Sequence, residues 1–111
     1  MINPHSPSEK TKKLMYLKIH KSYRTVVALC DEELLGKKFE EGIRQLDCRE
    51  SFYKDKLISY EEAVKTIQFQ MNEDATFNIV GEKSTRSAIE SGLIEEENRI
   101  RIAGIPFTLV F

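Results

Sequence analysis

The chain has 111 residues, of which 41% are hydrophobic and 32% are charged, and its net charge is −1. This length fits one domain with its own core, and the composition excludes a disordered chain. No apolar run reaches the roughly 18 to 20 residues of a membrane span, and the first residues, MINPHSPSEKTKK, lack the apolar centre of a signal peptide. We therefore predict a cytoplasmic protein without a membrane partner.

The near-zero net charge hides an uneven distribution along the chain. Residues 1–24 carry six basic side chains and one acidic one, whereas residues 25–111 carry 11 basic and 17 acidic side chains. A basic start on an acidic body is typical of a surface that meets nucleic acid. It is equally typical of a solvated tail followed by a strand edge protected against aggregation. Both interpretations stay open.

The chain begins with a basic segment and continues as a predicted hairpin. Residues 1–14 hold two prolines, two serines and three lysines without periodicity, which predicts a flexible basic tail before a single domain at 15–111. Residues 15–22 alternate in polarity, and residues 25–30, TVVALC, start with β-branched side chains. These two patterns predict a pair of antiparallel strands.

The segment DEELLGKKFEEG, residues 31–42, has the pattern of a first helix. Asp31 is a good N-cap, the two glutamates after it suit the positive end of a helix, and Gly42 can close the C-terminus. Residues 43–48, IRQLDC, then alternate in polarity and predict a third strand.

A second helix is the clearest element of the sequence. Ser59 followed by Glu62 forms a capping box, which marks a helix start. Apolar residues then recur at helical spacing and form one face: Tyr60, Ala63, Val64, Ile67 and Met71. Phe69 lies off that face, which leaves it to pack elsewhere or to be exposed.

The segment TFNIVG, residues 76–81, has two interpretations. It is either a strand that ends at Gly81 or the approach to a helix with Asn78 as its N-cap. In both cases a third helix runs through Ala88 and ends at Gly92.

Two further strands complete the predicted fold. Residues 98–104 alternate in polarity, and residues 105–111 form an apolar run in which Pro106 favours a sheet edge. The elements together predict a small single α/β (α+β) domain with a mixed sheet of about six short strands, an N-terminal hairpin and three helices.

The stretch NIVGEKSTR, residues 78–86, contains the residue types of a phosphate-binding loop. A Walker loop requires G-x-x-x-x-G-K-[ST], but Thr76 occupies the first glycine position and Glu82 separates Gly81 from Lys83. A nucleotide-binding loop is therefore excluded.

A weaker anion site remains open in the same stretch. A helix that begins near Gly81 could hold one anion, such as an RNA phosphate, through Lys83, Ser84 and Arg86. A helix that begins at Asn78 would place Gly81 in the first turn, where glycine permits close packing. We favour packing.

The sequence predicts no catalytic residue, no metal site and no cofactor. The adjacent glutamate pairs lie on predicted helices, where neighbours point apart, and His5 and His20 are the only histidines. Cys30 and Cys48 do not form a metal-binding motif, and Cys30 is expected to be a small core residue. Enzymatic activity is thus the least favoured class.

Nucleic-acid binding has compositional support at the start of the domain. Lysines and an arginine there alternate with Tyr16 and Tyr23, and aromatic faces beside basic groups can stack bases and neutralise phosphates. No known RNA-binding signature occurs in the chain. The candidate anion- or RNA-binding residues are Lys18, Lys21, Arg24, Lys83, Ser84 and Arg86.

Several segments resemble the archaeal domain-of-unknown-function family 424: ALCDEELLGKKFEEG, NIVGEKS and IRIAGIP. The resemblance covers roughly residues 15–106. It implies an archaeal, cytoplasmic, single-domain α/β protein and brings no activity and no catalytic residues. It also suggests one shared surface, made of Asp31, Glu32, Glu33, Gly36 and Gly81.

Two functional classes follow from the sequence. The leading hypothesis is a non-catalytic binding or assembly module, with RNA or the ribosome as its partner. The alternative is a protein–protein interaction module that dimerises or docks through a strand edge or through Phe69.

Overall fold

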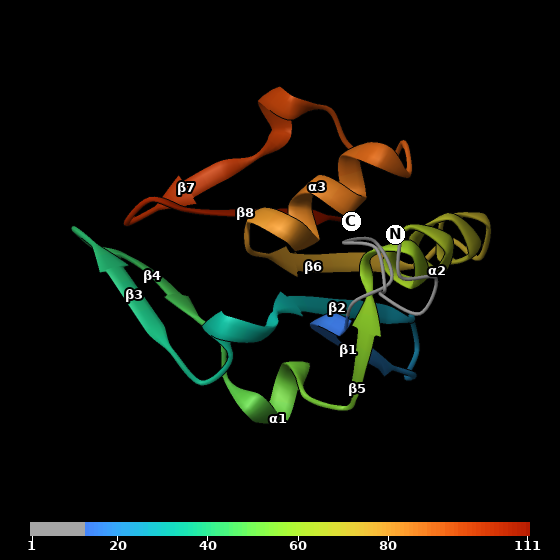
Figure 1. The fold of residues 1–111 in the computed structure, drawn as a ribbon, viewed down its shortest axis with the longest axis horizontal. Coiled ribbons are helices and arrows are strands. Elements are labelled where there is room, and N and C mark those ends of the chain that lie inside the picture. Colours follow the sequence, from blue (N-terminus) through green and yellow to red (C-terminus); the bar gives the residue numbers. More distant parts are fainter. Residues whose placement is uncertain (1–12) are drawn as a thin grey trace, which may run out of the picture.

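A computed structural model describes residues 13–111 of the chain (Figure 1). Of the predicted tail at 1–14, residues 1–12 lie outside the described part, and residues 13 and 14 already belong to the first strand. The main sheet has the strand order β5-β1-β2-β6-β8-β7. Its strands are β1 (Lys13–His20), β2 (Val26–Asp31), β5 (Lys56–Ser59), β6 (Thr76–Val80), β7 (Ile100–Ile102) and β8 (Ile105–Val110).

The sheet is mixed because one pair of strands is parallel. β1 and β2 form the predicted hairpin, with Leu17 opposite Leu29, while β2 runs parallel to β6, with Leu29 opposite Ile79. The other neighbouring pairs are antiparallel. Together with the three α-helices, this arrangement confirms the predicted α+β domain.

The helices are α1 (Glu50–Tyr53), α2 (Tyr60–Asn72) and α3 (Glu82–Glu90), with short 3-10 turns η2 (Glu32–Leu34) and η3 (Glu96–Asn98). The predicted capping box starts α2: the Ser59 hydroxyl accepts from the Glu62 N–H at 3.1 Å, and the Glu62 carboxylate accepts from the Ser59 N–H at 3.0 Å. Phe69 is 61% exposed, off the buried face. Within residues 13–111, no helix is long and apolar enough to cross a membrane.

The predicted helix over residues 31–42 is wrong. After η2 the chain forms a separate hairpin of β3 (Lys38–Glu41) and β4 (Arg44–Asp47). Gly36 and Gly42 have φ values of 84° and 63°, which do not occur inside a right-handed helix. Phe39 lies opposite Leu46, so it packs across a hairpin and not on the face of a helix.

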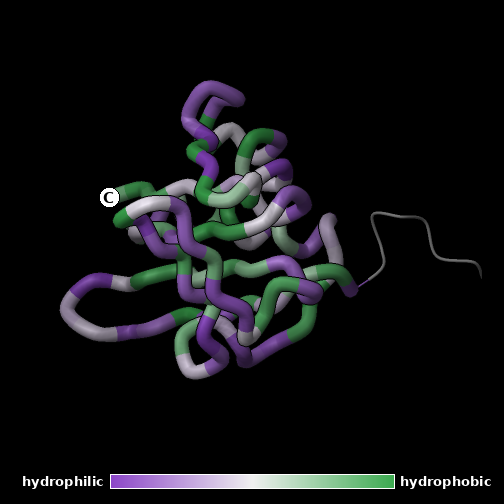
Figure 2. The backbone as a smooth tube through the Cα atoms, turned by 90° about the vertical axis from the view of Figure 1, so that its left-hand side faces the viewer, coloured by the Kyte–Doolittle hydropathy of each residue, from purple (hydrophilic) through white to green (hydrophobic). Residues whose placement is uncertain are grey.

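The sheet carries a core on each face. Helices α2 and α3 cover one face, and α1 with the β3–β4 hairpin covers the other face near the carboxyl end of β2 (Figure 1). Figure 2 shows hydrophobic stretches, in green, running through the middle of the molecule and hydrophilic ones, in purple, in the outer loops. The helix-side core contains Met15, Leu29, Ile67, Phe77, Ile79 and Ala88. The hairpin-side core contains Cys30, Leu46, Cys48, Tyr53, Val80 and Phe107.

Residues 76–81 form a strand, so the alternative helix start at Asn78 is wrong. β6 ends at Val80, Gly81 is the N-cap, and α3 begins at Glu82. A run of β-branched and aromatic residues paired on both sides outweighs the capping preference of Asn78.

The predicted edge position of Pro106 is also wrong, because β8 lies between β6 and β7. The Pro106 carbonyl accepts from the Gly81 N–H at 2.8 Å, so the nitrogen of Pro106 faces the same neighbour. The Gly81 carbonyl is already used by the Thr85 N–H at 2.9 Å. An interior proline is tolerated there because its missing N–H has no partner to lose.

Candidate functional site

The centre of the sheet contains a topological switch point. β2 and β6 are parallel neighbours, and the chain leaves β2 toward the β1–β5 side but leaves β6 toward the β8–β7 side. In open sheets, the crevice outside the carboxyl ends of such strands is a common place for a ligand site. Here Asp31 and Gly81 occupy it.

Asp31 ends β2 and is only 1% exposed. Its carboxylate accepts hydrogen bonds from the Lys83 N–H at 3.0 Å, the Ser84 N–H at 2.8 Å and the Ser84 hydroxyl at 2.7 Å. The first N–H groups of a helix have no acceptor within the helix and lie at the positive end of its dipole. A carboxylate of the chain itself therefore takes the position that a bound anion would have.

Gly81 permits this close approach. It has φ 112° and ψ 160°, a region that only glycine readily occupies. A Cβ atom at this position would lie 2.2 Å from Cγ of Asp31. Gly81 thus serves close packing, as the sequence favoured, although it does so at the N-cap rather than in the first turn of the helix.

The environment of Asp31 changes the pKa of its carboxyl in two opposite directions. Burial raises the pKa of the Asp31 carboxyl, while hydrogen bonds from Ser84 and Lys83 lower it, and burial has the larger effect. Because the pKa of Asp31 is higher in the folded than in the unfolded state, the free energy of unfolding decreases as the pH rises above the ordinary pKa of 3.8 and Asp31 ionises. The hydrogen bonds therefore stabilise the ionised carboxylate, while its burial destabilises it.

The proposed shared surface is brought together only in part. Asp31 contacts Gly81, and the Glu33 carboxylate accepts from the Lys83 ammonium at 2.9 Å. Burial raises the pKa of Glu33, but this hydrogen bond and the Lys83 charge leave that pKa lowered overall. Glu32 is exposed in η2, and the Gly36 N–H instead donates to the Cys48 carbonyl at 2.7 Å. Whether this surface binds anything stays a prediction.

The candidates Lys21 and Arg24 precede the start of β2, and Lys18 on β1 lies opposite Ala28 in the middle of β2. The Lys18 ammonium donates to the Ser51 carbonyl at 2.9 Å, and Arg24 pairs with Asp74 at 3.4 Å. Lys21 is exposed in the connection between β1 and β2.

The other three candidates lie on α3, beyond the carboxyl end of β2. Ser84 is fully buried, Lys83 pairs with Glu33, and Arg86 pairs with Glu82 at 3.1 Å. The two sets therefore lie apart and do not form one cluster.

Arg99 forms a charge cluster that the sequence did not predict. Its side chain is 7% exposed, and it donates to the carboxylates of Glu82 and Glu96. The hydrogen bond from Arg99 lowers the pKa of Glu82. A helix-start glutamate 17 residues before an arginine gives no local pattern, so only the fold reveals the pair.

We predict that Glu82→Gln flattens the acid limb of the stability curve. The folded-state pKa of Glu82 lies below its ordinary 4.5, so its contribution is complete above pH 4.5 and is lost as pH falls through the folded value. Urea unfolding should show the variant about 1 kcal/mol less stable at pH 7 and nearly equal to the wild type near the acid end. Arg86→Gln is the control, because Arg86 is the exposed partner of Glu82. A difference between the Glu82 variant and the wild type that does not change with pH would contradict the assignment.

The two cysteines are free thiols in the hairpin-side core, and Cys30 is the small core residue that was predicted. A hydrogen bond with Cys48 and burial raise the pKa of the Cys30 thiol. His20 stacks on Phe52 with ring centres 4.6 Å apart. Within residues 13–111, no group of three His, Cys, Asp or Glu side chains is arranged to hold a metal ion.

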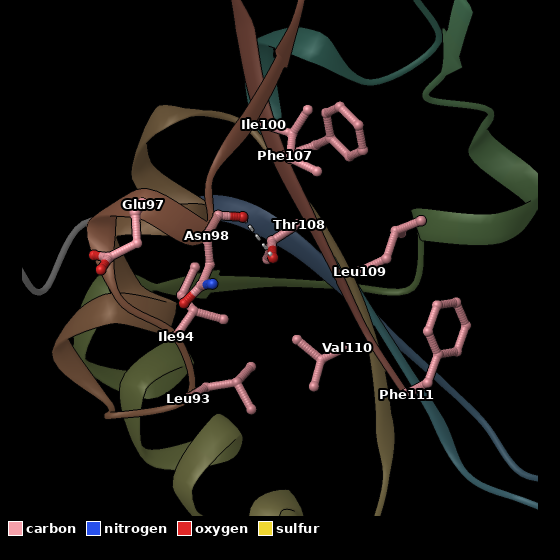
Figure 3. A pocket seen from close by; sticks show the side chains of 10 residues that line it. All are labelled: Leu93, Ile94, Glu97, Asn98, Ile100, Phe107, Thr108, Leu109, Val110 and Phe111. Atoms are coloured by element: carbon pink, nitrogen blue, oxygen red, sulfur yellow. Dashed lines mark hydrogen bonds between the residues drawn. The ribbon is translucent and has the colours of Figure 1, made fainter.

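A groove of about 520 Å³ lies beside β8 (Figure 3). Leu93, Ile94 and Val110 line its helix side, whereas Leu109 and Phe111 point to the opposite side of the strand. The other residues around the groove are Glu97, Asn98, Ile100, Phe107 and Thr108.

The outer edge of β8 is open along this groove. β7 pairs with β8 only as far as Ile100 opposite Phe107. Before Ile100 the chain forms η3, whose Asn98 carbonyl accepts from the Thr108 hydroxyl at 3.4 Å. Pro106 hydrogen-bonds toward β6, so by alternation the N–H and C=O of Leu109 point toward the open edge. Leu109 is 47% exposed and Phe111 85% exposed. Within the part of the chain that the structure describes, this edge thus combines backbone groups that no neighbouring strand pairs with exposed apolar side chains.

The fold and these surfaces define a small single-domain α+β protein. The Asp31 carboxylate occupies the anion position at the centre of its sheet, and β7 leaves the edge of β8 at Leu109 uncovered. A family model described as "Protein of unknown function (DUF424)" matches residues 19–111, and the chain belongs to this family. A solved structure described as an uncharacterized conserved protein from Methanopyrus kandleri has a TM-score of 0.79 and 29% sequence identity. That match covers 86% of this chain and 89% of the other. No curated protein matches the chain.

The family segments find a structural role in the fold. CDEELLGK contributes Asp31 and NIVGEKS contributes Gly81 and Ser84, and these three residues form the closed contact at the sheet centre. The two most specific segments of the resemblance are therefore partners in one packing contact.

Proposed function

We propose that the protein is a non-catalytic binding module that holds an extended segment of a protein partner along the open edge of β8. The observation that carries this proposal is the edge of β8 at Leu109, where no strand within residues 13–111 pairs on the side away from β6, beside a groove lined largely by apolar side chains. A strand edge gives backbone hydrogen bonds to an added strand, and flanking pockets select its side chains.

The apolar surface around the edge supports the same conclusion. Leu109 and Phe111 project from one side of β8, and Ile100 on the neighbouring strand is 48% exposed. An added strand would cover all three and fill the groove on the other side. Contiguous exposed apolar surface of this kind is characteristic of interaction sites.

The geometry supports RNA less well. Arg24, Lys83 and Arg86 each pair with an acidic residue, and the buried Ser84 hydroxyl donates to Asp31. A phosphate would have to displace carboxylates at each of these places. RNA, a cytoplasmic location and an archaeal setting for this chain stay predictions from the sequence.

Leu109→Arg should weaken partner binding without unfolding the protein. The probe is a phage-displayed library of random heptapeptides, selected on the wild type, with the affinity of selected peptides measured by fluorescence polarisation. We expect binding to Leu109→Arg to be weaker by about thirtyfold, since a central apolar contact is typically worth about 2 kcal/mol. The Leu109 amide should also gain protection from hydrogen exchange when peptide binds.

Phe69→Arg is the matched control, because Phe69 is an exposed aromatic residue on α2 and the alternative docking point named by the sequence. This variant should bind selected peptides like the wild type. Equal binding by Leu109→Arg would refute the β8 edge, and loss with Phe69→Arg would move the site to α2. Failure to select any peptide, together with salt-dependent filter binding of total RNA, would favour the RNA hypothesis.

A further inference from the structure

We infer that the segment held at the edge of β8 is the same edge of a second copy of this chain. This inference rests on the proposed function and adds the identity of the partner. The last residues of the two β8 strands pair antiparallel about a two-fold axis at Val110, which joins the two six-stranded sheets into one continuous sheet.

The backbone along this edge is complementary to itself. The N–H and C=O of Leu109 point away from β6, and the same alternation gives Phe111 the same direction. A two-fold axis at Val110 places Leu109 of each copy opposite Phe111 of the other. Each of these residues then exchanges its N–H and C=O with its counterpart, as in a regular antiparallel pair.

The end of β7 restricts where the axis can lie. An axis at Leu109 would place Phe111 opposite Phe107 of the second copy, where Ile100 of β7 already pairs. An axis at Val110 places Phe111 opposite Leu109 instead, where no strand within residues 13–111 pairs on that side. Two copies can therefore pair about Val110 without displacing β7.

The exposed apolar residues of this edge become covered together in the same register. Leu109 and Phe111, which are 47% and 85% exposed, point to one side of β8 (Figure 3). In the joined sheet, Phe111 of the second copy lies beside Leu109 and continues the line of β7 beyond Ile100, which is 48% exposed. One symmetric contact thus accounts for all three exposed side chains.

The contact has the size of a specific but weak interface. From their exposed fractions, the three residues of both copies would bury about 700 Å² of apolar side-chain area. On the helix side, Val110 of each copy would face the other beside the groove that Leu93 lines. With the paired backbones, the total reaches about the 1,000 Å² that such interfaces need. We therefore expect a dissociation constant on the order of 10 µM.

The charges of the sheet edges point to the same place. Exposed edges are usually protected against a second chain by basic side chains. β5, at one edge of the sheet, begins with the exposed Lys56, and β7, at the other, carries the exposed Arg101. Residues 108–111 hold no charged side chain, so two copies meet there without repulsion between like charges.

Light scattering tests the self-association. We expect the mass of the wild type to rise from monomer to dimer between about tenfold below and about tenfold above the expected dissociation constant. Leu109→Arg should raise that constant at least about hundredfold, because both copies lose the same central contact. Phe69→Arg is the matched control on α2 and should dimerise like the wild type.

Cysteine cross-linking tests the register. Val110→Cys should form a covalent dimer with oxidised glutathione, because residues that face each other in a non-hydrogen-bonded pair have Cα atoms about 4.5 Å apart. Leu109→Cys is the control, since the two side chains would lie diagonally about 7–8 Å apart, too far for a disulfide. The native thiols of Cys30 and Cys48 are fully buried. Cross-linking of Leu109→Cys in place of Val110→Cys would overturn the axis.

The outcomes separate this inference from the proposed function. A wild type that stays monomeric, while peptides selected from the random library bind at Leu109, would refute the second copy and leave strand addition standing. If neither a dimer nor a bound peptide is found, the proposed function itself fails. A dimer that Leu109→Arg does not weaken would place self-association on another surface. A monomer whose Leu109 amide loses protection from hydrogen exchange when residues 1–12 are deleted would assign the edge to that segment.

Discussion

Gly81→Ala is expected to lower the free energy of unfolding by about 4 kcal/mol, or the melting temperature by about 20 °C. The new Cβ would stand 2.2 Å from Cγ of Asp31, and φ 112° would be strained for any residue with a side chain. Relief of the clash requires Asp31 to move away from Lys83 and Ser84, which breaks the cap of α3. Since a domain of this size has a total stability of about 5–15 kcal/mol, this loss would remove between about a quarter and four fifths of it.

Two comparisons make this expectation specific. Gly42→Ala also places a side chain at positive φ, but no atom lies within 4 Å of its Cβ, so it should cost only about 1 kcal/mol. The double variant with Asp31→Ala removes the atoms that clash, and its loss should be smaller than the sum of the single losses by at least about 1 kcal/mol. Full additivity by urea unfolding would show that Gly81 and Asp31 do not act on each other.

Asp31→Ala is expected to lower the free energy of unfolding by about 2–3 kcal/mol. The substitution leaves the N–H groups of Lys83 and Ser84 and the Ser84 hydroxyl without their acceptor in a buried place. The cost of burying the carboxylate, which raises its pKa, offsets part of this loss. Urea unfolding at pH 7 measures the difference.

Asp31→Asn separates the charge from the shape of the side chain. The amide keeps one acceptor oxygen, but in either orientation its NH₂ group faces a backbone N–H donor of α3, so the loss should be about 1–2 kcal/mol. Hydrogen exchange should show weakened protection in the first turn of α3 in both variants. An alanine variant as stable as the wild type would mean that Asp31 does not cap the helix.

These expectations explain why the most motif-like stretch of the chain is not a ligand site. NIVGEKS presents a helix start of the kind that binds anions, and the Asp31 carboxylate fills it from a strand 53 residues earlier than Ser84. The candidate binding surface lies instead at the edge of β8, because β7 ends before it reaches Leu109.

The sequence by itself determined the elements that short-range forces decide. The capping box of Ser59 and Glu62 set the start of α2, because both partners lie within one helical turn. Alternating polarity predicted β1 and a run of β-branched residues predicted β2, and the two strands pair with each other across a short connection. Gly92, with φ 89°, ends the turn after α3 where the sequence placed it.

Only the tertiary structure decided the elements and contacts that depend on distant partners. Phe39 satisfies a helix pattern and a hairpin pattern equally, and its pairing with Leu46 against the core selects the hairpin. Pro106 is tolerated inside the sheet because the Gly81 carbonyl, which faces its nitrogen, already accepts a hydrogen bond from the Thr85 N–H. The closed anion position at Asp31 and the open edge at Leu109 both arise from strand order, which local propensity does not encode, because hydrogen bonds across a sheet join residues far apart in the chain.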